Sequence, residues 1–377
     1  MFALKQSEAK FDLFLVCTGL GRVQRGFESY IRDLAEKLTN ESVDFTFQVF
    51  LGKRLSGTFF EQQPVFHLPR GLKLFRKLGI SELTGFSIEQ LTFFCGLLPH
   101  VLIKKPKAIY LGEYNLYCYL YKFREIFGLS YSLVLYTGGQ VAPGLFDNQK
   151  DFVHHITDVY YNQLIKQGVP PNRQFILPHF IDLNFPINDR LVSMIKNKAN
   201  GKKIFLSVGQ IDKQIKRMHL IPQILTGVSD KVFPVVVGAN TSDTEDIVAS
   251  LKSTFGSDGF IVTQSSRSEI GSYYAAADCF ILCSAKESFG LAFVEALFFN
   301  LPIICHDFQE AHFVLEGNAH YLNLDEADKA SDWVENHFLM LNKSERINGA
   351  AFVKEHYTWE SLRTGYLSMF NTILLSN

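Results

Sequence analysis

The chain has 377 residues, of which 47% are hydrophobic and 20% are charged, and its formal net charge is −1. This amount of apolar sequence predicts two packed cores, and therefore two domains. A net charge near zero gives no overall field that would favour a nucleic-acid partner. The charge is nevertheless uneven, because residues 1–180 carry a net +5 and the remainder carries −6. This asymmetry indicates a different partner for each half.

The six cysteines show no CxxC spacing and lie mostly within apolar runs; they are at positions 17, 95, 118, 279, 283 and 305. This pattern indicates reduced, buried thiols in an intracellular protein and argues against a disulfide framework or a zinc site. Asp12 interrupts the apolar start FDLFLVCTG, so a strand followed by a glycine loop fits better than a signal peptide. We find no apolar run as long as a transmembrane helix and expect a soluble or peripheral protein.

The chain opens with the pattern of a Rossmann-like unit. Residues 11–17 predict a buried strand, residues 18–21 predict a tight loop, and a helix with one apolar stripe follows from Arg22. The loop sequence GLGR lacks the third glycine of a dinucleotide fingerprint, and a plain turn with a helix cap explains it equally well. In the functional alternative, Gly21 and Arg22 let a sugar or a phosphate approach the backbone.

Further strands are predicted at 45–51, 108–111 and 133–136, with an aromatic helix over 117–127 between the last two. The strand that ends at Tyr136 leads into the loop TGGQ, which contains Gly139 and Gln140. Doubly wound sheets hold their ligands at the carboxyl ends of strands, so both residues are candidates for binding a sugar. His154 and His155 are expected on the helix that follows.

Residues 68–80, LPRGLKLFRKLGI, form a short cationic amphipathic stretch. Its apolar and basic positions alternate at helical spacing: Leu72, Phe75 and Ile80 against Lys73, Arg76 and Lys77. Such stretches can lie on anionic membranes. A surface helix that covers its own core is the alternative, and it is the more common explanation of such a pattern.

The second half repeats the alternation of strands and helices. The polar residues 184–202 are expected to form the passage into the second domain, which opens with a strand at 203–208 followed by Gly209. Further strands are predicted at 233–237 and 260–262, and a terminal helix begins at Trp359. The predicted domains are therefore residues 1–180 and 181–358, with the helix of residues 359–377 packing back toward the first domain.

The segment from Asp278 to Pro302 carries the most chemistry. A strand at 279–283 ends in a loop with Glu287, and a helix follows Ser288. The first backbone N–H groups of that helix have no partner within the helix, and its dipole adds positive potential, so its start is an anion site. With Glu295 further along the helix, two carboxylates surround this site, which suits a nucleotide-sugar. Taken alone, two such glutamates are more often a solvated surface.

A second candidate is the pair Lys216 and Arg217, which follows the first strand of the second domain. A cation there would point to the sheet edge that carries Glu287, and it would offset the charge of a diphosphate. Because the surrounding DKQIKR is polar throughout, a solvated charge run is the alternative and is favoured when the pair is considered by itself.

Together these segments resemble the family-four, or group 1, retaining glycosyltransferases. The resemblance rests on two glutamates separated by seven residues, on PHFID at 178–182, on VGQ and KR within 208–217, on the N-terminal glycine loop and on the helix that begins at Trp359. It implies the GT-B fold, an α/β architecture in which two Rossmann-like, doubly wound domains face each other across a cleft. It also implies that a sugar is transferred from a nucleotide-sugar substrate with retention, without a metal and without a further cofactor.

The resemblance also implies roles for individual residues. Lys216 and Glu287 form the expected catalytic pair: the lysine contacts the diphosphate and the glutamate faces the donor sugar. Glu295 accepts hydrogen bonds from the ribose diol. The remaining donor-binding residues are Gly21, Gly209, Arg217, Phe289, Gly290 and Leu291. On the side of the donor sugar or the acceptor we expect Arg22, Gly139 and Gln140.

Three positions depart from the family pattern. Gln210 stands where an arginine is usual, TGGQ at 137–140 where a histidine is frequent, and Phe180 where the PNGVD motif has glycine. The leading hypothesis is a cytoplasmic glycosyltransferase of hexosyltransferase type, acting on a glycan, lipid or protein-linked acceptor. Residues 68–80 are the candidate for a peripheral membrane contact, with a surface helix as the alternative. A nucleotide-sugar epimerase or hydrolase is one alternative. A non-catalytic carbohydrate-binding or complex-partner protein of the same fold is the other.

Overall fold

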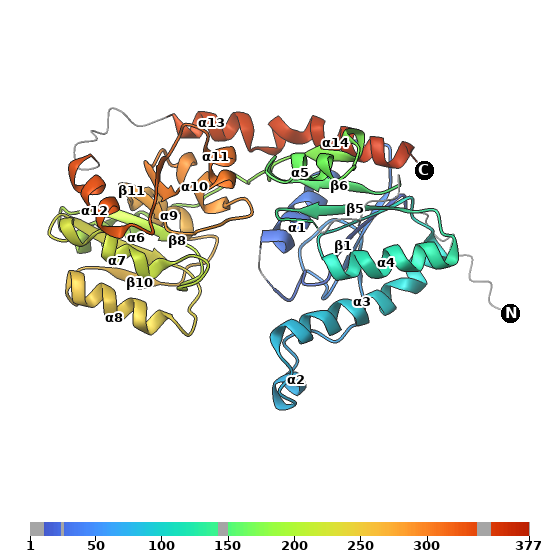
Figure 1. The fold of residues 1–377 in the computed structure, drawn as a ribbon, viewed down its shortest axis with the longest axis horizontal. Coiled ribbons are helices and arrows are strands. Elements are labelled where there is room, and N and C mark those ends of the chain that lie inside the picture. Colours follow the sequence, from blue (N-terminus) through green and yellow to red (C-terminus); the bar gives the residue numbers. More distant parts are fainter. Residues whose placement is uncertain (1–10, 24–25, 142–149, 338–347, 377) are drawn as a thin grey trace. The chain divides into compact units, whose positions relative to one another are not determined.

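The structure is a computed structural model that describes residues 11–376 except 24–25, 142–149 and 338–347. The chain forms two compact units (Figure 1). Unit 1 comprises residues 1–177 and 363–377, and unit 2 comprises residues 178–362. The last helix, α14 (Trp359–Leu375), begins in unit 2 and continues into unit 1.

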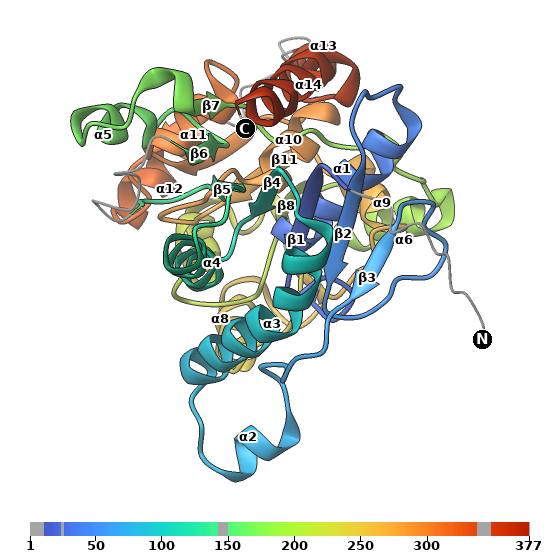
Figure 2. The same ribbon diagram turned by 90° about the vertical axis from the view of Figure 1, so that its right-hand side faces the viewer.

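Unit 1 is built on a sheet whose described strand pairs are all parallel, in the order β3-β2-β1-β4-β5-β6-β7. The strands are β1 (Leu13–Cys17), β2 (Phe47–Leu51), β3 (Gln62–Pro64), β4 (Ala108–Leu111), β5 (Ser132–Thr137), β6 (Phe152–His155) and β7 (Gln174–Ile176). The helices are α1 (Gly26–Asn40), α2 (Lys73–Lys77), α3 (Glu82–Lys104), α4 (Tyr114–Phe127) and α5 (Tyr161–Lys166). Helices α3 and α4 pack against each other, and α2 lies beyond the first turn of α3 (Figures 1 and 2).

Unit 2 has a second parallel sheet in the order β10-β9-β8-β11-β12-β13. Its strands are β8 (Lys203–Val208), β9 (Val232–Val237), β10 (Ile261–Thr263), β11 (Cys279–Leu282), β12 (Ile303–His306) and β13 (His320–Leu322). Its helices are α6 (Asp189–Ala199), α7 (Ile221–Ile224), α8 (Thr244–Phe255), α9 (Ile270–Ala276), α10 (Leu291–Phe298), α11 (Gln309–Leu315), α12 (Ala327–Asn336) and α13 (Gly349–His356).

The central strands are apolar throughout because parallel sheets are covered on both faces. Every residue of β1, β4 and β11 is buried, whichever way its side chain points. This explains why these short runs were recognisable in the sequence as strands without alternation. Residues 108–111 and 203–208 form strands with the predicted bounds.

Three predictions about local structure were wrong. His154 and His155 end strand β6, which lies between β5 and β7, and are not on a helix. Their rings form hydrogen bonds within the protein, His154 with the carbonyl oxygen of Leu177 and His155 with the side chain of Gln174. Residues 184–202 are not a simple passage, since they contain α6, which packs against α9 within unit 2.

The third wrong prediction was that no apolar run is as long as a transmembrane helix. Helix α3 has 23 residues and a stretch with a mean hydropathy of 1.4, so it is long and apolar enough to cross a membrane. Composition and length alone support that possibility, and the structure shows how the helix is used in unit 1. Phe93, Leu97 and Val101 belong to the core of the unit. Buried Gln90 accepts a hydrogen bond from the N–H of Leu116 at 3.1 Å, as expected of a helix built into a protein interior.

His154 is the centre of a buried polar network in unit 1. Its Nε2 lies 2.8 Å from the carbonyl oxygen of Leu177, and its Nδ1 lies 2.6 Å from the hydroxyl of Tyr110, which is 3.0 Å from that of Tyr30. A carbonyl can only accept, so Nε2 carries the proton and Nδ1 accepts from Tyr110. Burial lowers the pKa of His154 to about 3, and the network therefore requires a neutral imidazole.

This network predicts a loss of stability in acid. The pKa of His154 is lowered in the folded state, so only the unfolded chain takes up this proton as the pH falls below 6.5, until about pH 3 is reached. Between pH 7 and pH 5 the single group should cost about 2 kcal/mol of unfolding free energy. Denaturant unfolding of the wild type and of His154→Gln at both pH values measures this difference. His312→Gln controls for the loss of an exposed histidine. Equal pH dependence of wild type and His154→Gln would contradict the assignment.

Candidate functional site: the carboxyl edge of the unit 2 sheet

The candidate site lies where the strand order of unit 2 reverses. Strand β8 pairs with β9 on one side and with β11 on the other, and Phe205 is in register with Cys279. Because both strands run parallel, the loops after Val208 and after Leu282 leave the sheet at the same edge. This reversal is the place where doubly wound sheets bind ligands.

Asp212 shapes the loop after β8. Its Oδ1 accepts hydrogen bonds from the backbone N–H groups of Gln214 at 3.0 Å, Ile215 at 2.6 Å and Lys216 at 2.9 Å. Three N–H groups converging on one carboxylate oxygen make a tight turn, and the turn carries Lys216 back over the end of the sheet. The sequence had suggested a solvated charge run as the alternative, but this loop is folded around a buried acid.

Gly209 provides the surface over which Lys216 lies. A Cβ atom at Gly209 would be 3.1 Å from Cε of Lys216, and a Cβ atom at Gly238 would be only 1.6 Å from the carbonyl oxygen of Gly209. The loop after β8 and the end of β9 can approach this closely only without these side chains. The glycine predicted at the site therefore positions the lysine.

Lys216 and Glu287 meet directly. The ammonium group of Lys216 forms an ion pair with Oε1 of Glu287, and the hydroxyl of Ser284 donates to the same oxygen at 2.6 Å. The side chains are largely buried, with 20% of the lysine and 11% of the glutamate exposed. The two residues that the family resemblance assigns to the catalytic pair are thus brought together from loops 71 positions apart.

Arg217 joins the same two loops at a different point. Its Nε donates to the carbonyl oxygen of Cys283 at 2.7 Å, and its guanidinium group also forms an ion pair with Asp325. A further guanidinium nitrogen is buried without a hydrogen-bond partner. Arg217 therefore holds the loop after β11 in place. Its guanidinium nitrogen without a partner favours the binding of an anion nearby.

The start of α10 has the features of an anion site. Gly290 is the residue before the helix and has φ 80° and ψ 60°, a left-handed conformation that favours glycine. Among the described residues, no acceptor meets the backbone N–H groups of Phe289, Gly290 or Leu291. The ring of Phe289 packs against those of His179 and Tyr357, with centroid distances of 5.1 and 5.5 Å. The side chain thus holds the loop in place, while the backbone N–H groups are the free donors.

Glu295 lies in the second turn of α10 and is buried. Its Oε2 accepts from the hydroxyl of Tyr274 at 2.8 Å, and Arg267 contacts its Oε1 at 3.4 Å. Burial raises the pKa of Glu295, while Arg267 and Tyr274 lower it. The carboxylate is therefore oriented by two neighbours, Tyr274 and Arg267.

The candidates in unit 1 lie at the carboxyl edge of the first sheet. Gly21 has φ 81°, and a Cβ atom there would be 1.9 Å from the carbonyl oxygen of Lys53, so the loop requires glycine. Arg22 is exposed, and its Nε donates to Gly52 at 3.1 Å. The N–H of Gly139 is bonded to Thr137 at 3.1 Å, and Gln140 is exposed. Both loops follow parallel strands and therefore lie at the same edge of the sheet.

Glu113 is a residue at this edge that the sequence analysis missed. It follows β4, the strand that pairs with β1 where the strand order of unit 1 reverses. Its Oε1 accepts from the N–H and the hydroxyl of Thr18 at 2.7 and 2.9 Å, whereas its Oε2 is buried without a partner. Burial raises the pKa of Glu113 to about 7, and the nearby Glu28 adds to that rise.

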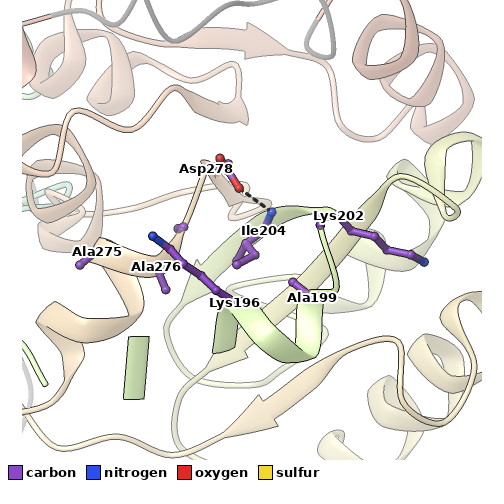
Figure 3. A pocket seen from close by; sticks show the side chains of 9 residues that line it. Lys196, Ala199, Lys202, Ile204, Ala275, Ala276 and Asp278 are labelled. Atoms are coloured by element: carbon purple, nitrogen blue, oxygen red, sulfur yellow. Dashed lines mark hydrogen bonds between the residues drawn. The ribbon is translucent and has the colours of Figure 1, made fainter. Parts of the chain in front are cut away.

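A pocket of about 350 Å³ lies elsewhere in unit 2 (Figure 3). Lys196, Ala276 and Asp278 are among its lining residues, and Asp278 accepts from the N–H of Ile204 at 3.1 Å. Ile204 lies near the amino end of β8, whereas Gly209 follows its carboxyl end. The pocket is therefore at the opposite edge of the sheet from the candidate site.

In the described part of the chain, no group of three or more His, Cys, Asp or Glu side chains is placed to hold a metal ion. The six cysteines are free, and Cys95 is the most exposed of them.

The sequence profile of the glycosyl transferases group 1 matches residues 191–331, a segment that runs from α6 to α12. This match confirms the resemblance to the group 1 glycosyltransferases that the sequence motifs indicated. No curated protein sequence matches the chain.

Solved structures share the fold over nearly the whole chain. Sucrose-phosphate synthase from Thermosynechococcus elongatus has a TM-score of 0.77 at 15% identity, with coverage of 97% of this chain and 99% of that one. Anabaena HepE in complex with UDP and glucose has a TM-score of 0.70 at 14% identity, covering 96% and 100%. WaaG, a glycosyltransferase involved in lipopolysaccharide biosynthesis, has a TM-score of 0.65 at 12% identity, covering 95% and 99%. These likenesses and the two parallel sheets establish the predicted GT-B fold.

Several residues that build the site carried no signal in the sequence. Asp212, Ser284, Arg267 and Tyr274 hold the loops or the glutamates in place. Asp212 could have been suspected, because an aspartate at the start of a mostly polar loop is typical of a side-chain-capped turn. Arg267 and Tyr274 contact Glu295 from the segment around α9, and only the folded chain shows that proximity.

Glu113 generates a stability prediction. The pKa of this carboxyl is raised in the folded state, so its stabilising neutral form is lost as the pH rises from about 4.5 to about 7. Between pH 5 and pH 8, Glu113→Gln should therefore gain about 2 kcal/mol of unfolding free energy relative to wild type. Denaturant unfolding at the two pH values gives the difference directly. The exposed Glu125→Gln is the control, and the same gain in both variants would refute the burial argument.

Proposed function

We propose that the protein is a retaining glycosyltransferase that moves a sugar from a nucleotide-diphosphate-sugar to an acceptor hydroxyl. The observation that carries the proposal is the contact between Lys216 and Glu287 beside the unpartnered N–H groups at the start of α10. At one sheet edge the chain presents the ammonium group of Lys216, the start of helix α10 and the carboxylate of Glu287. The first two suit a diphosphate, and the carboxylate suits the hydroxyl groups of a sugar. The match of residues 191–331 to the group 1 glycosyl transferase profile supports the same chemistry.

In this proposal Lys216 acts on the leaving group. The bond between the anomeric carbon and the diphosphate oxygen breaks, and the acceptor oxygen forms the new bond to the same carbon. The acceptor's proton passes to the departing diphosphate, so no protein nucleophile is required. Negative charge grows on the diphosphate as the bond breaks, and a fixed ammonium group stabilises that transition state more than the ground state.

Glu287 and Glu295 have different tasks. An ammonium group has three donors, so Lys216 can keep Glu287 and still bind a phosphate oxygen. Glu287 is then fixed by Lys216 and Ser284, and its other oxygen is available for a hydroxyl of the donor sugar. Glu295, oriented by Tyr274 and Arg267, accepts from the ribose diol. Arg217 supplies a second positive charge near the position where Gln210 has replaced an arginine.

The proposal includes several finer points: retention at the anomeric carbon, transfer of a hexose, independence from metal ions and cofactors, and a cytoplasmic location. The donor is a nucleotide-sugar, a class supported by the HepE structure, which contains UDP and glucose. The acceptor is a glycan or a lipid. A peripheral membrane contact through residues 68–80 belongs to the same proposal, since a lipid-linked acceptor must be reached at a bilayer surface.

Binding of the donor can be tested without knowing the acceptor. Thermal unfolding with UDP-, GDP- and ADP-sugars should show one base whose sugar, at one hundred times its Kd, stabilises the protein by about 2.7 kcal/mol. Lys216→Ala and Glu295→Ala should each weaken that binding about 30-fold, because each removes a charge-assisted hydrogen bond. Lys213→Ala is the matched control, since this lysine on the same loop pairs with Asp246 instead. Unchanged affinity in both site variants would reject the site.

Product analysis distinguishes the proposed activity from its alternatives. With the donor identified above, transfer to an acceptor mixture should exceed the consumption of donor alone by at least about 100-fold, since water is a poor substitute for a positioned hydroxyl. Donor consumption at the full rate without an acceptor would indicate an epimerase or a hydrolase. Tight donor binding without turnover on any acceptor would indicate the non-catalytic alternative, which the Gln210 substitution motivates.

A further inference from the structure

Large apolar side chains are exposed along one short segment of unit 1, residues 66–83. Phe66 is 85% exposed, Leu74 53%, Leu78 64% and Leu83 81%, and Leu68 is partly exposed as well. The segment leads from the end of β3 through α2 into the first turn of α3. Single exposed leucines need no explanation, but five large apolar side chains within eighteen positions do.

The segment is firmly attached to α3. Arg70 is bound by buried Glu89 through its backbone N–H at 2.8 Å and its Nε at 2.6 Å. The N–H of Leu68 donates to the hydroxyl of Thr92 at 3.0 Å. Phe75 is buried beside Gly85, where an added Cβ would be 3.5 Å from its ring. The exposed side chains are therefore presented by an ordered scaffold.

Apolar, buried and basic side chains lie on different sides of helix α2. Leu78 directly follows α2, and its N–H donates to the carbonyl oxygen of Leu74 at 3.0 Å, so the two leucines lie on one side. Phe75 is buried, and Lys73 and Lys77 lie on the next side. All four outer side chains are exposed. In both views α2 lies farther from the sheet than α3 does (Figures 1 and 2). Two leucines flanked by two lysines at a protruding end form an amphipathic tip.

The charge of the segment has one sign. Residues 66–83 contain four arginines or lysines and one acid, Glu82. Arg70 forms an ion pair with Glu89 on α3. Among the described residues, neither Lys73 nor Lys77 has an ion-pair partner. Both lysines are therefore free to meet an anionic surface.

We propose that Phe66, Leu68, Leu74, Leu78 and Leu83, together with Lys73 and Lys77, form a docking surface for a bilayer that contains anionic lipid. We name these residues the α2 surface. The leucines and the phenylalanine enter the boundary between headgroups and acyl chains, while the lysines stay at the level of the lipid phosphates. This inference deepens the proposed function by naming a bilayer as the partner of unit 1, although vesicle binding itself does not depend on the donor site.

A bilayer fits the α2 surface better than a second protein does. Protein interfaces gather apolar side chains into a central patch and exclude lysine from it. Here the lysines lie next to the leucines on a helix of only five residues, and the surface protrudes. Such a tip is sufficient for a shallow, reversible contact with lipid. The lysines are attracted to the anionic headgroups, and the few apolar side chains enter the bilayer at the same time.

The test uses the full-length protein and flotation with two kinds of vesicle: phosphatidylcholine alone, and phosphatidylcholine with about one third phosphatidylglycerol. The wild type should bind the anionic vesicles at low salt, bind the neutral ones at least about tenfold more weakly, and lose affinity as salt rises. Leu74→Ser with Leu78→Ser, and Lys73→Gln with Lys77→Gln, should each reduce binding about tenfold or more.

The controls make the same chemical changes on an exposed face of unit 2. Ile187→Ser with Met194→Ser, and Lys196→Gln with Lys198→Gln, should leave vesicle binding unchanged. Circular dichroism and nucleotide-sugar binding, which should be unaffected in all four variants, separate a lost docking surface from a misfolded protein or a failed donor site. The inference is overturned if the wild type floats with neither vesicle, or if the control pairs lose as much binding as the α2 pairs. It is equally overturned if Leu74→Ser with Leu78→Ser abolishes a concentration-dependent dimer but leaves vesicle binding intact.

Discussion

The parallel pairing of β8 with β11 is the constraint on which the candidate site depends. These strands are separated by some seventy positions in the chain, yet Phe205 and Cys279 are neighbours in the sheet. Because both strands point the same way, everything that follows them emerges at one edge. The turn built by Asp212 and the loop that begins at Cys283 then lie close enough for Lys216 to pair with Glu287, and for Arg217 to bond the carbonyl oxygen of Cys283. If this pairing were shifted, the two loops could not meet.

The site is pre-organised, but several of its hydrogen-bond donors have no acceptor in the described part of the chain. Lys216 and Glu287 neutralise each other, whereas the start of α10 keeps free N–H donors and Arg217 keeps an unpartnered nitrogen. Unsatisfied donors at a sheet edge are costly in a structure and persist where a ligand supplies the missing acceptors. A diphosphate has the charge and the number of oxygens to complete such a set. Gly238 serves the same end, since a side chain there would collide with the carbonyl oxygen of Gly209.

The two units divide the chemistry between them. Unit 2 concentrates fixed charges around a helix start, as a donor site for a polyanion requires. Unit 1 carries a buried aromatic network around His154, an orphaned carboxyl oxygen on Glu113 and an exposed apolar and basic tip at α2. The uneven charge of the chain, positive in the first 180 residues and negative in the rest, follows this division. A basic half suits an anionic surface, and an acidic half suits the hydroxyl groups of sugars.

The sequence by itself determined the elements whose burial is complete. Strands such as Ala108–Leu111 and Cys279–Leu282 are continuous apolar runs because parallel strands are covered on both faces, and the strand, loop and helix around Glu287 showed the family motif directly. Only the tertiary structure decided which residues surround that motif. His154 and His155 were expected on a helix but belong to a strand between β5 and β7, and Asp212, Tyr274 and Arg267 became part of the site through strand pairing and helix packing. Local patterns record how each segment is buried, but contacts between distant segments depend on strand order, which no single segment encodes.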